Sequence, residues 1–319
     1  MNTKLANTIK IAVTLGLLLV VAFTLDLSQV WTALASANWA DLAIALLLYQ
    51  GGIVVRAYRW QALLRAFGVE ASLPRLTRIY YVGMFFNSFL PSGFGGDVVR
   101  MVELSQDGAT APLAVSTVLV DRIMGLLVLF AMALVALPFS WRLVPPAVSL
   151  ALLALIAGVA VGIYLLLNRP LVEALARRVP PLGKLLARPK VAALYASFHR
   201  YDRPALARAA GASLVFNLSL IVTQAYLGRA VGVHLSLGYF FLFVPILSSL
   251  LTVPISISGF GVREGGYVVL FGQAGVAAPQ AVAMSLLFYA INALTGLVGG
   301  ALYLVQGAAG LRRRAAGPS

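Results

Sequence analysis

The stretch YYVGMFFNSFLPSGFGGDVVR, from Tyr80 to Arg100, decides the fold. It begins as an apolar run typical of a membrane helix, breaks at a proline and three glycines, and then supplies Asp97 and Arg100. Backbone that leaves its helix inside a membrane must be satisfied by protein or by a water-filled cavity. The stretch therefore predicts either a re-entrant broken helix or a Gly-rich turn at the membrane surface.

A second stretch, VPISISGFGVREGG from Val253 to Gly266, shares several features with the first. Both contain a proline, a serine and the tripeptide Gly-Phe-Gly, and in both an arginine and a carboxylate follow. Interruptions at corresponding positions in two halves of a membrane chain are the best sequence indication of a transporter's substrate site. The pair favours an inverted repeat, although a match this short can also arise by chance.

The composition is that of an all-α, polytopic helical membrane protein, because 61% of the 319 residues are hydrophobic and only 11% are charged. There is no cysteine, and His199 and His234 are far apart in sequence. We therefore expect no metal site and no cofactor. The whole chain, 1–319, is interpreted as a single transmembrane domain.

Apolar runs long enough to cross a membrane predict six spanning helices. They are Thr8–Leu25, Trp39–Val55, Pro112–Leu137, Pro146–Leu167, Ala209–Leu227 and Ala278–Gln306. The first run is interpreted as a retained helix rather than a signal peptide, because it is long and no A-x-A-like site closely follows it. Two broken segments, Ile79–Gln106 and Gly238–Ala274, are expected to be re-entrant hairpins.

The distribution of Lys and Arg predicts the orientation. Nine of these residues lie in 168–208 and three in the tail 310–319, whereas the predicted outer loops contain only Arg142 and Arg229. Both termini are then cytoplasmic, and the two hairpins enter from opposite faces. If each hairpin crossed fully instead, 168–208 would lie outside, which this rule disfavours.

The net charge of +14 comes largely from Lys and Arg in the predicted cytoplasmic segments. The orientation of the chain explains these residues, so we expect no nucleic-acid partner. Segment 168–208 is expected to form short basic amphipathic helices that contact anionic lipids of the inner leaflet. Ordinary topogenic charge explains the same residues equally well.

Charged and polar residues around the two breaks, and inside the span 112–137, are the candidates for substrate binding. Asp97 and Arg100 can pair on one helix face, Arg122 can meet a hairpin carboxylate, and Asp121 can meet an arginine. Structural ion pairs explain these residues as well as a site does. In a site, arginines and helix-start amides would bind phosphate, and the carboxylates, Glu264 included, would hold the arginines. The candidates are Asn87, Pro91, Gly93, Gly95, Gly96, Asp97, Arg100, Asp121, Arg122, Ser256, Gly259, Gly261, Arg263 and Glu264.

Several motifs, in this order, resemble the lysylphosphatidylglycerol synthase transmembrane-domain family over nearly the whole chain. They are Arg56-x-x-Arg59-Trp60, Asn87-x-Phe89-Leu90-Pro91, Gly95-Gly96-Asp97-x-x-Arg100, Asp121-Arg122-x-x-Gly125, Pro254-x-Ser256 and Gly259-Phe260-Gly261-x-Arg263-Glu264. The resemblance implies translocation of a lipid or lipid-linked substrate. It also implies that aminoacyl transfer resides in a separate soluble domain, for which we expect no room after the last span.

Two classes of function follow. The first is a flippase that moves an anionic, zwitterionic or lipid-linked phosphate substrate between leaflets, with no catalytic residue in this chain. No G-x-x-x-x-G-K-[ST] loop occurs, so we expect no ATP drive within it. The alternative is an integral-membrane transferase, or an accessory subunit, acting on a polyprenyl- or phospholipid-linked substrate. We expect a bacterial or archaeal plasma membrane; whether the protein forms a homo-oligomer or serves a partner enzyme stays open.

Overall fold

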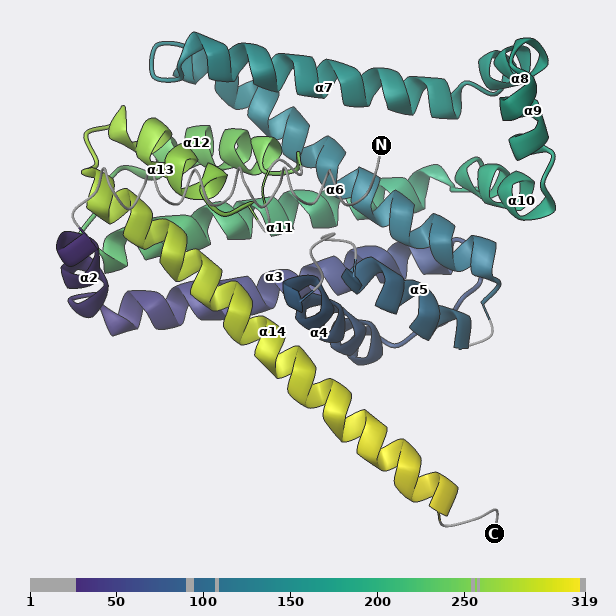
Figure 1. Cartoon of the computed structure of the whole chain (residues 1–319), viewed down its shortest axis with the longest axis horizontal. Helices are drawn as coiled ribbons and strands as arrows, with labels where there is room; N and C mark the ends of the chain where they lie inside the picture. The colour runs from purple at the N-terminus through teal and green to yellow at the C-terminus, as the bar shows by residue number, and fades with distance from the viewer. Residues whose placement is uncertain (1–26, 90–94, 107–108, 254–255, 257–258, 316–319) are drawn as a thin grey trace.

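A computed structural model describes residues 27–89, 95–106, 109–253, 256 and 259–315. Within them every regular element is a helix and no strand occurs, so the predicted all-α class is confirmed (Figure 1). In chain order the helices are α2 (Leu27–Ala35), α3 (Trp39–Arg65), α4 (Leu73–Phe89), α5 (Gly95–Gln106), α6 (Ala111–Ser140), α7 (Pro146–Leu167), α8 (Arg169–Arg178), α9 (Pro180–Leu186), α10 (Pro189–Phe198), α11 (Arg203–Ala230), α12 (Leu237–Leu250), α13 (Val262–Gly272) and α14 (Ala278–Ala315).

Five helices within the described part of the chain are long and apolar enough to cross a membrane: α3, α6, α7, α11 and α14. They coincide with five of the six predicted spans, and the remaining one, Thr8–Leu25, lies outside the described residues. Large apolar side chains such as Phe139, Leu153 and Leu304 are exposed on their outer faces. That exposure suits helices whose solvent is the hydrocarbon of a bilayer.

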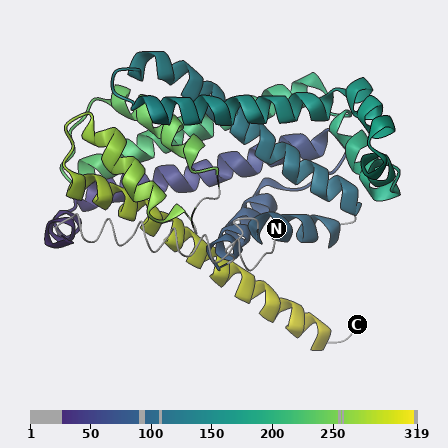
Figure 2. The same cartoon turned by 45° about the horizontal axis from the view of Figure 1, so that its top comes forward.

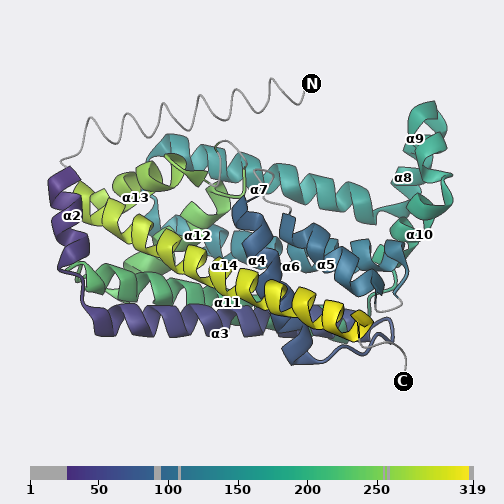
Figure 3. The same cartoon turned by 60° about the horizontal axis from the view of Figure 1, so that its bottom comes forward.

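The two predicted broken segments are pairs of short helices. α4 and α5 form one pair and α12 and α13 the other, and the pairs lie at opposite ends of the bundle (Figures 1 and 3). The backbones of α4 and α5 touch, since a Cβ on Gly83 would lie only 3.2 Å from the Cα of Gly96. The Oδ1 atom of Asn87 accepts a hydrogen bond from the Gly96 N–H at 2.7 Å. Glycine and asparagine at these positions therefore hold the first hairpin together.

The elements repeat in the order expected of an inverted repeat. One half is α3, the α4–α5 pair and α6; the other is α11, the α12–α13 pair and α14. α3 packs against α11 and runs antiparallel to it (Figure 1). α4 packs against α14, and its counterpart α12 packs against α6, the counterpart of α14. Each half therefore supplies a spanning helix that supports the hairpin of the other.

Helices α7 to α10 lie outside this repeat. α7 runs along the edge of the bundle, and α8, α9 and α10 form a cluster at its far end (Figure 2). Prolines divide the basic segment: Pro180 begins α9 and Pro189 begins α10. Proline suits the first turn of a helix because the N–H it lacks has no partner there. The cluster lies at the same end as the basic start of α11 and the end of α14 (Figure 1).

Candidate functional site

Two adjoining cavities inside the bundle, called here the chamber, lie where the two halves meet. The first measures about 270 Å³ and the second about 240 Å³. They share Arg56, Asn87, Asp97 and Arg100. Arg263, at the start of α13, also lines the first cavity, so both broken hairpins contribute to one space. The chamber therefore brings together residues that are as many as 243 positions apart in the sequence, from Tyr49 to Asn292.

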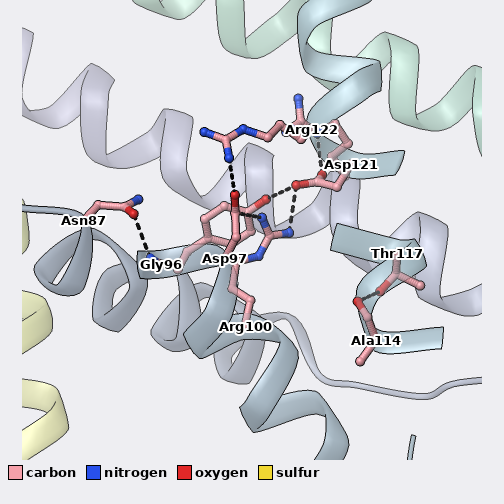
Figure 4. Close-up of polar contacts among 10 residues, drawn as sticks. Asn87, Gly96, Asp97, Arg100, Ala114, Thr117, Asp121 and Arg122 are labelled. Carbon is pink, nitrogen blue, oxygen red and sulfur yellow. Dashed lines mark hydrogen bonds and ion pairs between the residues drawn. The ribbon is translucent and has the colours of Figure 1, made fainter. Parts of the chain in front are cut away.

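Asp121, on α6, is the centre of a buried ion-pair network and is only 1% exposed. Its Oδ1 atom accepts a hydrogen bond from Nε of Arg59 at 2.6 Å. Its Oδ2 atom accepts one from Nη2 of Arg100 at 2.7 Å and one from the Tyr80 hydroxyl at 2.5 Å (Figure 4). Two guanidinium groups and a hydroxyl therefore compensate a charge that the membrane interior would otherwise penalise.

Asp97, on α5, is the second carboxylate of the chamber. It forms an ion pair with Arg122, while its Oδ1 atom is 3.4 Å from Nη1 of Arg100 (Figure 4). The expectations that Arg122 meets a hairpin carboxylate and that Asp121 meets an arginine are thus confirmed. The Arg122 side chain remains 40% exposed, whereas that of Arg100 is 4% exposed. Of these two arginines, Arg122 is the more accessible to a ligand.

Aromatic rings contact the guanidinium groups of Arg100 and Arg56. Arg100 lies between Trp60 and Tyr80, with its Cζ atom 4.3 Å and 4.2 Å from the ring centroids. Arg56 lies over Tyr80 at 5.0 Å and over Phe216 at 5.3 Å. Such cation–π contacts stabilise a guanidinium but leave its N–H donors available. Within the described residues no carboxylate lies within ion-pair distance of Arg56.

Glu264, on α13, has a role that the sequence did not predict. It is 2% exposed, and its carboxylate accepts hydrogen bonds from the Gly261 N–H at 2.6 Å and the Ser285 hydroxyl at 3.0 Å. Gly259 and Gly261 have φ angles of 77° and 80°, a region that favours glycine. Glu264 therefore caps the helix that follows the second break and holds it to α14.

The model for the lysylphosphatidylglycerol synthase TM region matches residues 7–300 of the chain. The chain belongs to this family. A similar protein is the UPF0104 membrane protein of Archaeoglobus fulgidus, which is 32% identical over 94 residues. That match covers 30% of this chain and 29% of the archaeal protein, so it extends over less than a third of either.

In this family member, the structure brings half of the sequence-predicted site residues to the chamber wall: Asn87, Gly96, Asp97, Arg100, Asp121, Arg122 and Arg263. Gly95 is buried at the start of α5, and Ser256 is buried between the described parts of the second break. Gly259, Gly261 and Glu264 shape the start of α13. Pro91 and Gly93 lie outside the described residues.

Sequence reasoning left several chamber residues out of the site. Arg56 and Arg59 belong to the Arg-x-x-Arg-Trp motif but are not among the candidate site residues, and both lie within the continuous helix α3. Their position in the Arg-x-x-Arg-Trp motif could have identified them as candidate site residues. Asn217 and Asn292 also line the chamber; as amides within apolar runs they are noticeable in the sequence, but interhelical hydrogen bonds explain them without a site. The hydroxyl-bearing chamber residues gave no separate signal: Tyr49, Tyr80, Ser248 and Tyr289. Among the described residues, no group of three His, Cys, Asp or Glu side chains could hold a metal ion.

Proposed function

We propose that this integral membrane protein moves a lipid with a phosphate in its headgroup between the two leaflets. The observation that carries the proposal is the position of the chamber. It is lined by arginines, and residues from the broken hairpins of both halves contribute to its wall. Charged groups at such depth are costly and mark substrate pathways in membrane proteins.

The chemistry of the chamber suits a phosphate. A guanidinium group binds phosphate oxygens through two parallel hydrogen bonds, which an ammonium group cannot do. Arg56 and Arg122 are the side chains best placed to make those bonds, because Arg59 and Arg100 are largely committed to Asp121. Rocking of one half against the other would expose the bound headgroup to each leaflet in turn.

The experiment uses the purified full chain in liposomes that contain a phospholipid with a fluorescent headgroup. A membrane-impermeant quencher then reports how fast the inner-leaflet label reaches the outer leaflet. We expect Arg56→Gln to slow this exchange by at least tenfold, since one strong phosphate contact contributes on the order of 1.5–3 kcal/mol. The matched control is Arg65→Gln, an exposed arginine near the end of the same helix, and it should transport at the parent rate.

The same liposomes also test the alternative, an integral-membrane transferase or its accessory subunit. Lipids extracted after the assay are separated by mass, so any new lipid product is detected. Exchange at the parent rate in Arg56→Gln, or product formation without exchange, would overturn the proposal.

A further inference from the structure

The chamber holds more positive than negative charge. Five arginines line it: Arg56, Arg59, Arg100, Arg122 and Arg263. The carboxylates that line it are Asp97 and Asp121, and Glu264 lies directly after Arg263 on α13. Residues 90–94 and 254–258, which form the two breaks, contain no Asp, Glu, Lys or Arg. With Glu264 included, two positive charges therefore remain in excess.

The neutral groups of the chamber do not offset this excess. Tyr49, Tyr289 and Asn292 contribute hydroxyl and amide groups to the first cavity, and these groups carry no charge. The Tyr289 ring already faces a guanidinium, since Cζ of Arg263 is 5.8 Å from its centroid. The Tyr80 ring likewise faces both Arg56 and Arg100. These two aromatic faces are therefore occupied and cannot form a cage for a cationic headgroup.

Charge left uncompensated in low dielectric is strongly unfavourable, so a ligand that neutralises the excess charge binds most tightly. Guanidinium groups keep their charge at every physiological pH, which means that the protein cannot relieve the excess by losing protons. The compensating charge has to come from the ligand. A phosphodiester headgroup supplies one negative charge, whereas a phosphomonoester or a diphosphate supplies two.

We infer that the chamber takes a lipid whose headgroup is a doubly negative phosphate, either a phosphomonoester or a diphosphate. This inference rests on the proposed function, because it assigns the substrate class of the same site. Lipids with one negative charge bind more weakly, and zwitterionic or cationic aminoacylated lipids bind weakest. The preference is thus the opposite of the one that an aminoacylated lipid substrate would require.

The test measures binding to the full chain in nanodiscs of a zwitterionic phospholipid that contain a small fraction of one test lipid. The test lipids are phosphatidic acid, a polyprenyl diphosphate, phosphatidylglycerol and lysylphosphatidylglycerol, and native mass spectrometry measures the occupancy of each. We expect the first two to bind at least about tenfold more tightly than phosphatidylglycerol, as for close charge pairs at interfaces. Equal affinity for phosphatidic acid and phosphatidylglycerol would overturn the inference.

A pH series on the unmodified protein gives an independent readout. The second ionisation of a phosphomonoester has a pKa near 6. Binding of phosphatidic acid should therefore strengthen between pH 5 and pH 8, about the range over which its second charge appears. Phosphatidylglycerol has no second ionisation, so its binding should stay constant, and parallel pH curves for the two lipids would contradict the inference.

Variants of the chamber test whether its excess positive charge causes the preference for a doubly negative lipid. Arg56→Gln removes one positive charge and should reduce the preference for phosphatidic acid over phosphatidylglycerol, while Arg65→Gln should leave it unchanged. An unchanged preference in Arg56→Gln would count against the inference. The exchange assay is run in parallel with phosphatidic acid that carries the fluorescent label on an acyl chain, and it distinguishes two failures. The expected binding order without any lipid exchange overturns the proposed function, whereas exchange without that order overturns only the substrate class.

Discussion

Individual residues of the chamber differ in how strongly the fold depends on them. Asp121 is 1% exposed and compensates two guanidinium groups that are themselves almost fully buried. Asp97 is 16% exposed, and its closest partner, Arg122, is 40% exposed. Water can therefore take over part of the charge compensation that Asp97 gives its arginine partners. It can take over little of the compensation that Asp121 gives to its own partners.

We expect Asp121→Asn to destabilise the protein much more than Asp97→Asn. Removing one partner of a buried ion pair typically costs about 3–5 kcal/mol, because the other charge is left uncompensated. Exposed pairs contribute roughly 0–1 kcal/mol. Thermal unfolding of the purified variants in one detergent, followed by circular dichroism, measures the difference, and equal losses of stability in the two variants would contradict this assignment.

At the scale of the helical elements, the first hairpin depends on the close approach of α4 and α5. A Cβ on Gly96 would meet the carbonyl oxygen of Gly83 and would lie 2.8 Å from Nδ2 of Asn87. The backbone oxygen cannot move away without shifting the helix. The chamber wall on this side is therefore set by two glycines.

Gly96→Ala should push α5 away from α4, lower stability by about 1–3 kcal/mol, and slow lipid exchange. The matched control is Gly265→Ala on α13, where an added Cβ meets nothing within 4 Å. There the substitution should be neutral or slightly stabilising, because alanine favours a helix by about 1 kcal/mol over glycine. Thermal unfolding and lipid exchange are measured on both variants. If Gly96→Ala keeps the parent stability and exchange rate, the first hairpin is not closely packed.

Sequence patterns predicted these elements well and their contacts less well. The two breaks were predictable because proline, glycine and charge interrupt apolar runs that are otherwise long enough to form membrane helices. The extent of α3 was not predictable from the sequence, since its apolar run ends at Val55 whereas the helix continues to Arg65. The bond from Arg59 to Asp121 joins residues 62 positions apart, and nothing local in the sequence specifies that pairing.

The whole molecule has a basic end and an end with little charge, which predicts its orientation in the membrane. Ser236, between α11 and α12, and Ser72, between α3 and α4, are both exposed and lie at opposite ends. Ser140 is fully buried and therefore unsuited to labelling, although it lies at the end of α6. Ser236→Cys and Ser72→Cys are thus the informative pair.

A membrane-impermeant thiol reagent added to intact cells should label Ser236→Cys and should reach Ser72→Cys only after permeabilisation. The native chain contains no cysteine, so all labelling comes from the introduced thiol. Labelling of Ser72→Cys in intact cells would reverse the orientation that the Lys and Arg distribution predicts.

The central claim is that lipid passes through the chamber as the two halves move against each other. Met84 on α4 and Tyr289 on α14 line the first cavity from different halves. In the double variant Met84→Cys, Tyr289→Cys, a short reducible crosslinker should therefore fix the halves together across that cavity. We predict that lipid exchange in liposomes falls to the protein-free rate after crosslinking and recovers when the linker is reduced. Exchange at the uncrosslinked rate in fully crosslinked protein would contradict the account.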